Sequence, residues 1–184
     1  MTEYYCTAFG SQFGEAALVW TERHGRPKVV RVVLPDPVLT IAKAVSRLFP
    51  TARTASCAAI DRLSRRIGRF LNGRPIDFKI DCIDMTQLHE FQKRVILLER
   101  RIPRGRTSTY GRIARRLGIP KAPRAVGQAL ARNPFPIIIP CHRVIRSDGS
   151  LGGYRGGMKL KRALLEFEGI RFDASGKTSI DGLW

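Results

Sequence analysis

The 184-residue sequence is poor in acidic residues, and this shortage is its strongest compositional feature. Only 15 Asp and Glu stand against 33 Lys and Arg, which gives a formal net charge of +18 and an isoelectric point near 11. Such an imbalance is typical of proteins whose partner is a polyanion, and nucleic acid is the first candidate. The competing interpretation is that the charge serves solubility alone or reflects an arginine-rich proteome.

Cysteines are few, and long apolar runs are absent. Cys6, Cys57, Cys82 and Cys141 form no CxxC pair and follow no regular spacing. This argues against a disulfide framework and a cysteine-rich zinc site, and it is typical of a reducing compartment. No segment reaches the roughly 20 apolar residues that a membrane span requires, and residues 1–13 lack the pattern of a signal peptide. We therefore expect a cytoplasmic protein that binds no membrane.

The first half of the chain has the pattern of a small α+β domain. Three short runs rich in β-branched and aromatic residues predict the strands of an antiparallel sheet: residues 4–9, 16–21 and 29–34. Two segments with apolar residues at helical spacing predict helices: residues 37–48 and 58–72. Residues 78–83 alternate weakly and predict a further strand. We expect the first domain to comprise residues 1–85.

From Thr86 onward the pattern changes to short helices joined by tight turns. Apolar spacing predicts four helices, at residues 88–101, 108–117, 122–132 and 159–167. Thr107 or Ser108 is the expected N-cap of the second helix. The second and third helices, with many Arg and Lys around them, indicate a helix-turn-helix motif that contacts DNA phosphates. We expect a second domain at residues 86–172 and a loose tail at residues 173–184.

The chemistry of the sequence centres on residues 133–144, where an apolar run leads to Pro140-Cys141-His142-Arg143. A thiol becomes a strong nucleophile when a nearby imidazole or cation promotes loss of its proton. An isolated cysteine is more often a small buried apolar side chain, but these neighbours favour a reactive one. Adjacent residues on an extended strand point to opposite faces, so a water molecule is expected to connect His142 with the sulfur.

Motifs around this stretch resemble the O6-alkylguanine-DNA alkyltransferases, also called methylated-DNA–protein-cysteine S-methyltransferases. Besides Pro140-Cys141-His142-Arg143-Val144, the motifs that carry the resemblance are Tyr110-Gly-Arg-Ile-Ala114, Arg124-Ala-Val-Gly127, Asn133-Pro134, Ser147-Asp-Gly149, Gly156-Gly157 and Leu164-Leu-Glu-Phe-Glu168-Gly169. The resemblance covers residues 91–169. It implies an α+β protein with a small N-terminal ribonuclease-H-like domain and a mostly helical C-terminal domain of the winged-helix or helix-turn-helix type.

The resemblance implies direct DNA repair by a protein that acts once. A cysteine takes the alkyl group from O6 of alkylated guanine, and O4-alkylthymine is a further candidate substrate. The duplex buries the target atom, so the base must be flipped into a pocket. The implied protein is a monomer that binds double-stranded DNA and needs no cofactor or metal. Some relatives hold zinc near the amino terminus, but the potential ligands are not diagnostically spaced here: Cys6, His24, Cys57 and His89.

The resemblance also assigns catalytic roles. Cys141 is the nucleophile, His142 takes its proton through water, and Glu168 orients the imidazole. Asn133 ties the turn and helps to polarise the thiol, and Tyr110 contacts the flipped base and returns a proton to guanine. Each of these residues also has a structural alternative: a satisfied buried histidine, a surface carboxylate, a helix-ending asparagine or a core tyrosine. Glu166 is the competitor of Glu168.

The remaining implied roles concern DNA and the base pocket. Arg124 fills the space left by the flipped base, or alternatively binds a phosphate. Ala125 and Gly127 are small, which suits close approach to a DNA groove. Three residues are implied to line the pocket for the guanine and its alkyl group: Pro140, Tyr154 and Gly156. Arg155 stands where the family often has a small residue, and it is expected to narrow the range of alkyl groups.

Three other functions remain as alternatives. A binding-only relative would sense alkylated bases without chemistry, but such proteins replace the cysteine that is present here. A helix-turn-helix regulator would need an additional cysteine-rich metal domain, for which this chain is too short. A cysteine hydrolase would need an oxyanion hole, and nothing in the sequence indicates one.

Overall fold

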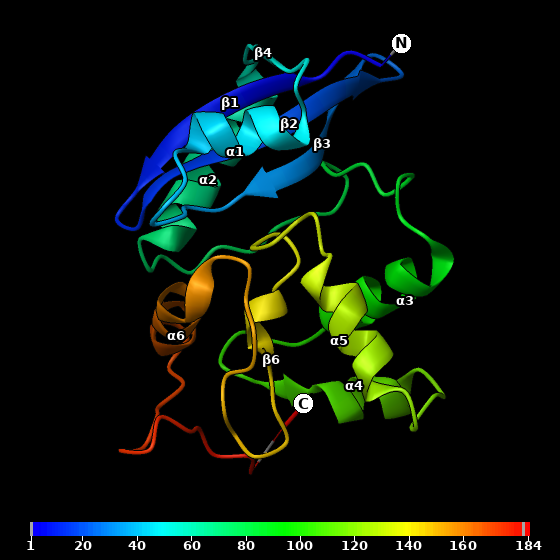
Figure 1. Ribbon diagram of the computed structural model, residues 1–184, viewed down its shortest axis with the longest axis vertical. Helices are drawn as coiled ribbons and strands as arrows, with labels where there is room; N and C mark the ends of the chain where they lie inside the picture. Colours follow the sequence, from blue (N-terminus) through cyan, green and yellow to red (C-terminus); the bar gives the residue numbers. More distant parts are fainter. Residues whose placement is uncertain (1, 182) are drawn as a thin grey trace. The chain divides into compact units, whose positions relative to one another are not determined.

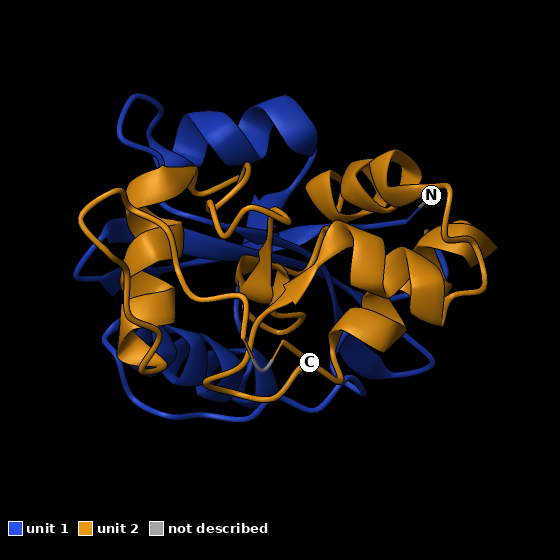
Figure 2. Ribbon diagram, turned by 90° about the horizontal axis from the view of Figure 1, so that it is seen from below, with its two compact units in different colours: residues 1–87 blue, residues 88–184 orange. Residues whose placement is uncertain are grey.

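In the computed structural model, which describes residues 2–181 and 183–184, the chain separates between Gln87 and Leu88 into two units (Figure 2). The first unit contains a mainly antiparallel sheet with two helices among its described residues, and the second is mostly helical. The predicted α+β class is therefore confirmed. Within the described residues, no helix is both long and apolar enough to cross a membrane.

A four-stranded sheet organises the first unit (Figure 1). Its strands, in the spatial order β3-β2-β1-β4, are β1 (Tyr5–Ser11), β2 (Gly14–Arg23), β3 (Arg26–Val33) and the two-residue β4 (Arg53–Thr54). The first three pair antiparallel as predicted, because the turn at Gly14 adopts a positive φ of 110° that glycine accommodates without strain. The parallel strand β4 lies in a segment that was not expected to contain a strand.

Two helices pack on this sheet. Helix α1 (Ile41–Leu48) places Ile41 and Val45 in the cluster that also buries Ala17 and Val19 of β2. Helix α2 (Ala58–Leu71) packs against β1 so closely at Gly68 that a Cβ there would lie 3.2 Å from the carbonyl oxygen of Gly10. The sheet and its helices thus bury the apolar faces that their sequence patterns indicated.

The strand predicted at residues 78–83 is wrong. Only Ile83 forms a β-bridge, with Val29, and the flanking backbone bonds join Val29 N–H to Cys82 and Asp84 N–H to Val29. Polar residues alternate with apolar ones in this segment, but a single contact with β3 is all that the fold provides. The alternating pattern therefore predicted a strand where only one β-bridge forms, because strand formation depends on an adjacent partner strand as well as on local sequence.

Among its described residues, the second unit contains four α-helices and a short pair of strands (Figure 1). The helices are α3 (Glu90–Glu99), α4 (Tyr110–Arg116), α5 (Pro123–Ala131) and α6 (Gly157–Phe167). A 3-10 helix, η1 (Cys141–Arg143), follows a buried apolar run that includes Phe135 and Ile137–Ile139. The predicted helices are thus present, and their observed ends differ from the expected ones by one to a few residues.

Strands β5 (Ser108–Thr109) and β6 (Val144–Ile145) pair in parallel next to η1. The pairing explains why the predicted N-cap of α4 is wrong. Ser108 belongs to the strand pair, and the cap is Thr109, whose side chain accepts a hydrogen bond from Arg112 N–H at 3.2 Å. The same pairing fixes the beginning of α4 beside the segment that follows Cys141.

The C-terminal segment, expected to be a loose tail, returns to the second unit. Trp184 N–H donates to the Thr107 carbonyl at 2.8 Å, and the Arg116 guanidinium lies 3.8 Å from the centroid of the Trp184 ring. Leu183 packs on the small cluster that contains Ile145 and Leu165. Apolar and aromatic side chains at positions 183 and 184 account for this packing, because they remove apolar surface from water.

Candidate active site

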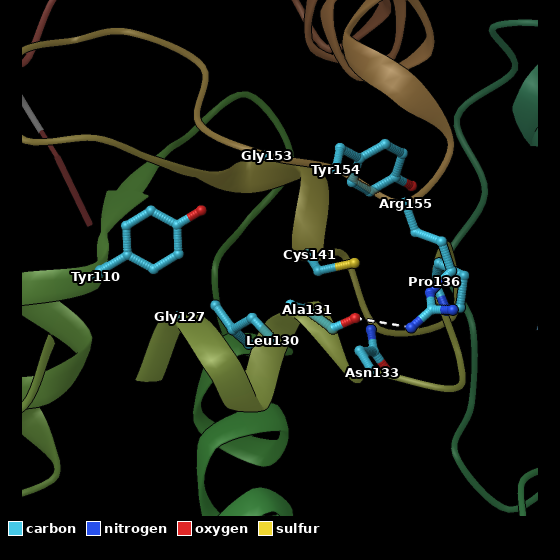
Figure 3. A pocket seen from close by; sticks show the side chains of 10 residues that line it. All are labelled: Tyr110, Gly127, Leu130, Ala131, Asn133, Pro136, Cys141, Gly153, Tyr154 and Arg155. Atoms are coloured by element: carbon cyan, nitrogen blue, oxygen red, sulfur yellow. Dashed lines mark hydrogen bonds between the residues drawn. The ribbon is translucent and has the colours of Figure 1, made fainter. Parts of the chain in front are cut away.

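A cavity of about 430 Å³ lies in the second unit, and Cys141 opens onto it (Figure 3). It lies between the start of α4 and the end of α5 on one side and the glycine-rich loop before α6 on the other. Figure 3 shows the Cys141 sulfur pointing into the space between these walls. The lining residues are Tyr110, Gly127, Leu130, Ala131, Asn133, Pro136, Cys141, Gly153, Tyr154 and Arg155.

Cys141 begins the 3-10 turn η1, so the premise of an extended strand at this point is wrong. The turn is closed by a hydrogen bond from Arg143 N–H to the Pro140 carbonyl at 2.9 Å. The pKa of the Cys141 thiol is raised to about 12, mainly by burial and also by the charge of Glu99, while a hydrogen bond from Asn133 opposes both effects. At neutral pH the resting thiol therefore keeps its proton, and its chemistry requires a base.

Asn133 connects the end of α5 to the apolar run that leads to the cysteine. Its side chain is buried, its Oδ1 accepts from Phe135 N–H at 2.9 Å, and its Nδ2 donates to the Ile139 carbonyl at 3.4 Å. These bonds satisfy both ends of the amide across the turn that Pro134 begins. The position is the one expected of a residue that couples the helix to Cys141.

His142 and Glu168 form a fully buried pair beside Cys141. The side chains of both residues have no exposed surface, and His142 Nε2 lies 3.0 Å from Glu168 Oε1. Arg143 completes the group, because its Nε donates to Glu168 Oε2 and its Nη2 to Glu168 Oε1, each at 2.8 Å. The competing Glu166 lies on the surface of α6 and pairs with Arg162 at 2.9 Å.

The electrostatics of this group define its protonation states. Burial alone would raise the pKa of Glu168, but hydrogen bonds from His142 and Arg143 lower it to about 2. Burial lowers the pKa of His142, although Glu168 partly offsets the shift. Near neutral pH the carboxylate is thus ionised and the imidazole neutral. Because a carboxylate only accepts, His142 Nε2 carries the hydrogen and Nδ1 carries the lone pair.

Two tyrosines line opposite walls of the cavity. Tyr110 begins α4, and a Cβ at Gly152 would lie only 3.0 Å from its hydroxyl oxygen. Gly127 of α5 faces the Tyr110 ring, since a Cβ there would lie 3.7 Å from it. The small size of Gly127 therefore opens the cavity as well as the surface of α5. The Tyr154 hydroxyl is buried and has no hydrogen-bond partner among the described residues.

Not every predicted site residue lines the cavity. Arg124 is exposed in the first turn of α5, and Ala125 beside it is half-buried. Pro140 and Gly156 are not among the described residues that line the cavity. Pro136, which was not predicted, lines it. Arg155, the unusual residue of the loop, donates from Nη2 to the Ala131 carbonyl at 2.8 Å and so links the loop to the end of α5 (Figure 3).

Reasoning from sequence gave no role to Arg143 or to Lys161, although both belong to the site. Arg143 was recognised only as part of a motif, yet it holds Glu168 with two hydrogen bonds. Lys161 of α6 is fully buried, and its Nζ donates to the carbonyls of Val144 at 2.6 Å and Gly153 at 3.5 Å. The only signal in the sequence was the position of Lys161 between Leu160 and Leu164, two apolar residues that the amphipathic pattern of this helix places in the core.

In the part of the chain that the structure describes, no group of three or more His, Cys, Asp and Glu side chains is placed to hold a metal ion. The four residues considered above as potential zinc ligands, Cys6, His24, Cys57 and His89, therefore form no such group.

The sequence is similar to a known protein family and to several characterised proteins. Residues 90–170 match the family described as 6-O-methylguanine DNA methyltransferase, DNA binding domain. The chain is 50% identical over 115 residues to a methylated-DNA–protein-cysteine methyltransferase of Methanothermobacter thermautotrophicus, a match that covers 62% of this chain and 64% of that protein. It is 40% identical over 140 residues to the protein of the same name from Mycolicibacterium paratuberculosis, covering 72% and 81% of the two chains.

Solved structures extend the similarity to the first unit. The structure of Mycobacterium tuberculosis OGT in complex with DNA superposes with a TM-score of 0.72 at 32% identity, covering 89% of this chain and 92% of that chain. A structure of the O6-methylguanine methyltransferase of the same organism gives a TM-score of 0.70 at 32% identity, with 95% and 96% covered.

Proposed function

Because the chain belongs to the methylated-DNA–protein-cysteine methyltransferase family, we propose that it repairs DNA by taking the alkyl group from O6 of alkylated guanine onto Cys141. One observation carries the proposal: the Cys141 thiol opens onto a cavity of about 430 Å³, and the next residue is a buried imidazole paired with a carboxylate. This is the combination of nucleophile, base and orienting group that activated thiols require.

The proposed reaction is a single displacement at the alkyl carbon. The Cys141 sulfur forms a bond to that carbon as the bond between the carbon and guanine O6 breaks. The thiol proton passes through water to Nδ1 of His142, and Glu168 stabilises the imidazolium that results. The Tyr110 hydroxyl, at the edge of the cavity, supplies a proton to the departing guanine and regains one from solvent, to which the His142 imidazolium releases the thiol proton. The product, S-alkylated Cys141, is a thioether. Because water does not hydrolyse a thioether, each protein molecule acts once.

The second unit has the charge that binding to duplex DNA requires. It contains 20 of the 33 Lys and Arg but only seven of the 15 Asp and Glu, so thirteen of the eighteen net positive charges belong to it. Phosphate contacts from such a surface provide affinity that depends on salt but little sequence preference. We propose that a monomer places α4 and α5 against double-stranded DNA, with Arg124 entering the base stack.

A target base must leave the duplex to reach Cys141, because the sulfur lies in a pocket bounded by helix and loop rather than in a groove that admits a double helix. The proposed flipped base is O6-alkylguanine, and O4-alkylthymine is a second candidate because it presents an alkyl group on a similar exocyclic oxygen. Arg155, linked to Ala131 across one wall, is the residue that we propose restricts the size of the alkyl group.

The direct test is covalent. Incubation with a duplex that contains one O6-methylguanine should add the mass of one methylene group to the tryptic peptide with Cys141, in a one-to-one ratio of methyl group to protein. Peptides with Cys6, Cys57 or Cys82 should stay unmodified. Tight binding of the damaged duplex with an unmodified Cys141 would contradict the proposal and favour the binding-only alternative.

Arg124→Ala should slow methyl transfer from duplex DNA by roughly tenfold, because extrusion of the base is then no longer assisted. Transfer from the free base O6-methylguanine needs no extrusion and should keep its rate. Single-turnover kinetics with both substrates measure the difference. Arg132→Ala is the matched control, since it removes the same charge from the exposed C-cap of the same helix. Equal slowing on both substrates would exclude a role of Arg124 in flipping.

A further inference from the structure

Glu99, the last residue of α3, is a buried carboxyl group that the proposed reaction does not use. Its side chain has no exposed surface, and neither oxygen has a hydrogen-bond partner among the described residues. A carboxyl at the C-terminal end of a helix also faces the negative end of the helix dipole. Burial of an unpaired acid without a role is costly, so a group of this kind requires an explanation.

The surroundings of Glu99 are those of the reactive cysteine. Five titratable or charged groups from four other segments interact electrostatically with the carboxyl: Lys161 of α6, Arg143 and Cys141 of η1, Tyr110 of α4 and Tyr154 of the loop before α6. Three of them, Cys141, Tyr110 and Tyr154, line the cavity. Glu99 is therefore buried within electrostatic range of the sulfur and of two further residues that line the cavity.

Lys161 is the partner through which Glu99 can act. Its ammonium group is fully buried and holds the carbonyl of Val144, which follows the Cys141 turn, and that of Gly153, which lines the cavity. Its positive charge favours the thiolate form of Cys141, and the negative charge of an ionised Glu99 opposes it. The acid and the ammonium thus have opposite effects on the same sulfur.

We propose that Glu99 is a positioning residue for the thiol chemistry, and that it acts together with Lys161 to set how readily Cys141 ionises. This inference rests on the proposed function, because it concerns the reactivity of the same cysteine. Glu99 itself does not touch the substrate; it changes the field in which the sulfur reacts.

The charge states give the proposal a direction. Burial raises the pKa of Glu99 to about 8 and lowers that of Lys161 to about 8. Near pH 6.5 the carboxyl is neutral and the ammonium is charged, so the net charge of the two groups is positive. Above pH 8 both groups lose protons, and the field changes from one that favours the thiolate to one that opposes it.

The test compares wild-type protein with Glu99→Gln, which keeps the shape of the side chain but cannot ionise. Cys141 is labelled with iodoacetamide in the absence of DNA at pH 6.5 and pH 9, and labelling is read from its peptide by mass spectrometry. The peptides with Cys6, Cys57 and Cys82 serve as internal references. The ratio of the variant rate to the wild-type rate should rise by roughly fivefold from pH 6.5 to pH 9.

Glu166→Gln is the matched control, because this exposed carboxyl of α6 pairs with Arg162 and lies outside the site. Its rate ratio should be the same at both pH values. Glu99→Leu, an apolar replacement suited to a buried position, repeats the measurement should the glutamine variant fail to fold, as judged by circular dichroism. A ratio that is independent of pH in a folded Glu99 variant would overturn the proposal.

The labelling experiment also separates this inference from the proposed function. A flat ratio in a protein that still accepts methyl groups from DNA would reject the role of Glu99 alone. A rising ratio in a protein that never accepts methyl groups would retain that role and reject the proposed repair reaction.

Discussion

Cys141→Ala should abolish alkyl transfer, by at least about three orders of magnitude, and leave the affinity for alkylated duplex DNA nearly unchanged. The sulfur is the only atom in the proposed reaction that forms a bond to the alkyl carbon, and no other cysteine is among the described residues that line the cavity. Binding should persist because it depends on the basic surface of the second unit and on the cavity walls. Truncation of one half-buried thiol leaves both in place.

Transfer is measured by peptide mass spectrometry and affinity by fluorescence anisotropy with a duplex that contains O6-methylguanine. Cys57→Ala is the matched control, because Cys57 is half-buried at the N-cap of α2 in the other unit and makes no side-chain cap bond there. It should keep full transfer. Methylation of another cysteine in Cys141→Ala, or loss of DNA binding in that variant, would disagree with the assignment.

The fold could be predicted where local sequence determines it. Strands β1 to β3 and helix α2 were placed to within a few residues, because β-branched alternation and helical spacing continue without interruption in them. Strand β4 was missed and a strand at residues 78–83 was wrongly predicted, since both depend on the strand that lies alongside. The N-cap at Thr109 was missed for the same reason: its neighbour Ser108 pairs with Val144.

The candidate site shows the same division. Cys141, His142 and Glu168 were selected from motifs, and the structure brings the last two into contact, although their roles stay predictions. The 3-10 turn at Cys141 could not be predicted, because an apolar run that ends in proline resembles an extended strand. Lys161 and Glu99 were missed because a charged residue on an amphipathic helix normally faces water, and only the tertiary fold shows that these two are buried.

Glu168→Gln should destabilise the protein by about 3–5 kcal/mol at pH 7, because it removes the ionised partner of a largely buried arginine. The Glu168 carboxylate has no exposed surface, the Arg143 side chain is 11% exposed, and both oxygens accept from that guanidinium. A neutral amide cannot balance the charge, and its NH₂ group would face another donor. Loss of the partner also makes His142 a weaker base, so transfer should slow by roughly a hundredfold.

The effect on stability should depend on pH in a direction that the pKa of Glu168 defines. Its pKa is about 2 in the folded protein, compared with about 4.3 for a glutamate in an unfolded chain. The stabilisation is therefore complete above pH 5 and is lost as the pH falls through 2, below which both states are protonated. The shift corresponds to about 3 kcal/mol, so urea unfolding should show most of the wild-type advantage at pH 7 and little of it near pH 2.

Glu166→Gln provides the comparison within the same helix. This carboxylate is 48% exposed and pairs with Arg162 at the surface, so its loss should change the free energy of unfolding by less than about 1 kcal/mol and leave transfer unaffected. If the two variants were equally stable at pH 7, the buried Glu168 group would not hold the last turn of α6 to the Cys141 segment. A difference that persists unchanged at pH 2 would place the stabilisation in packing rather than in the charge of Glu168.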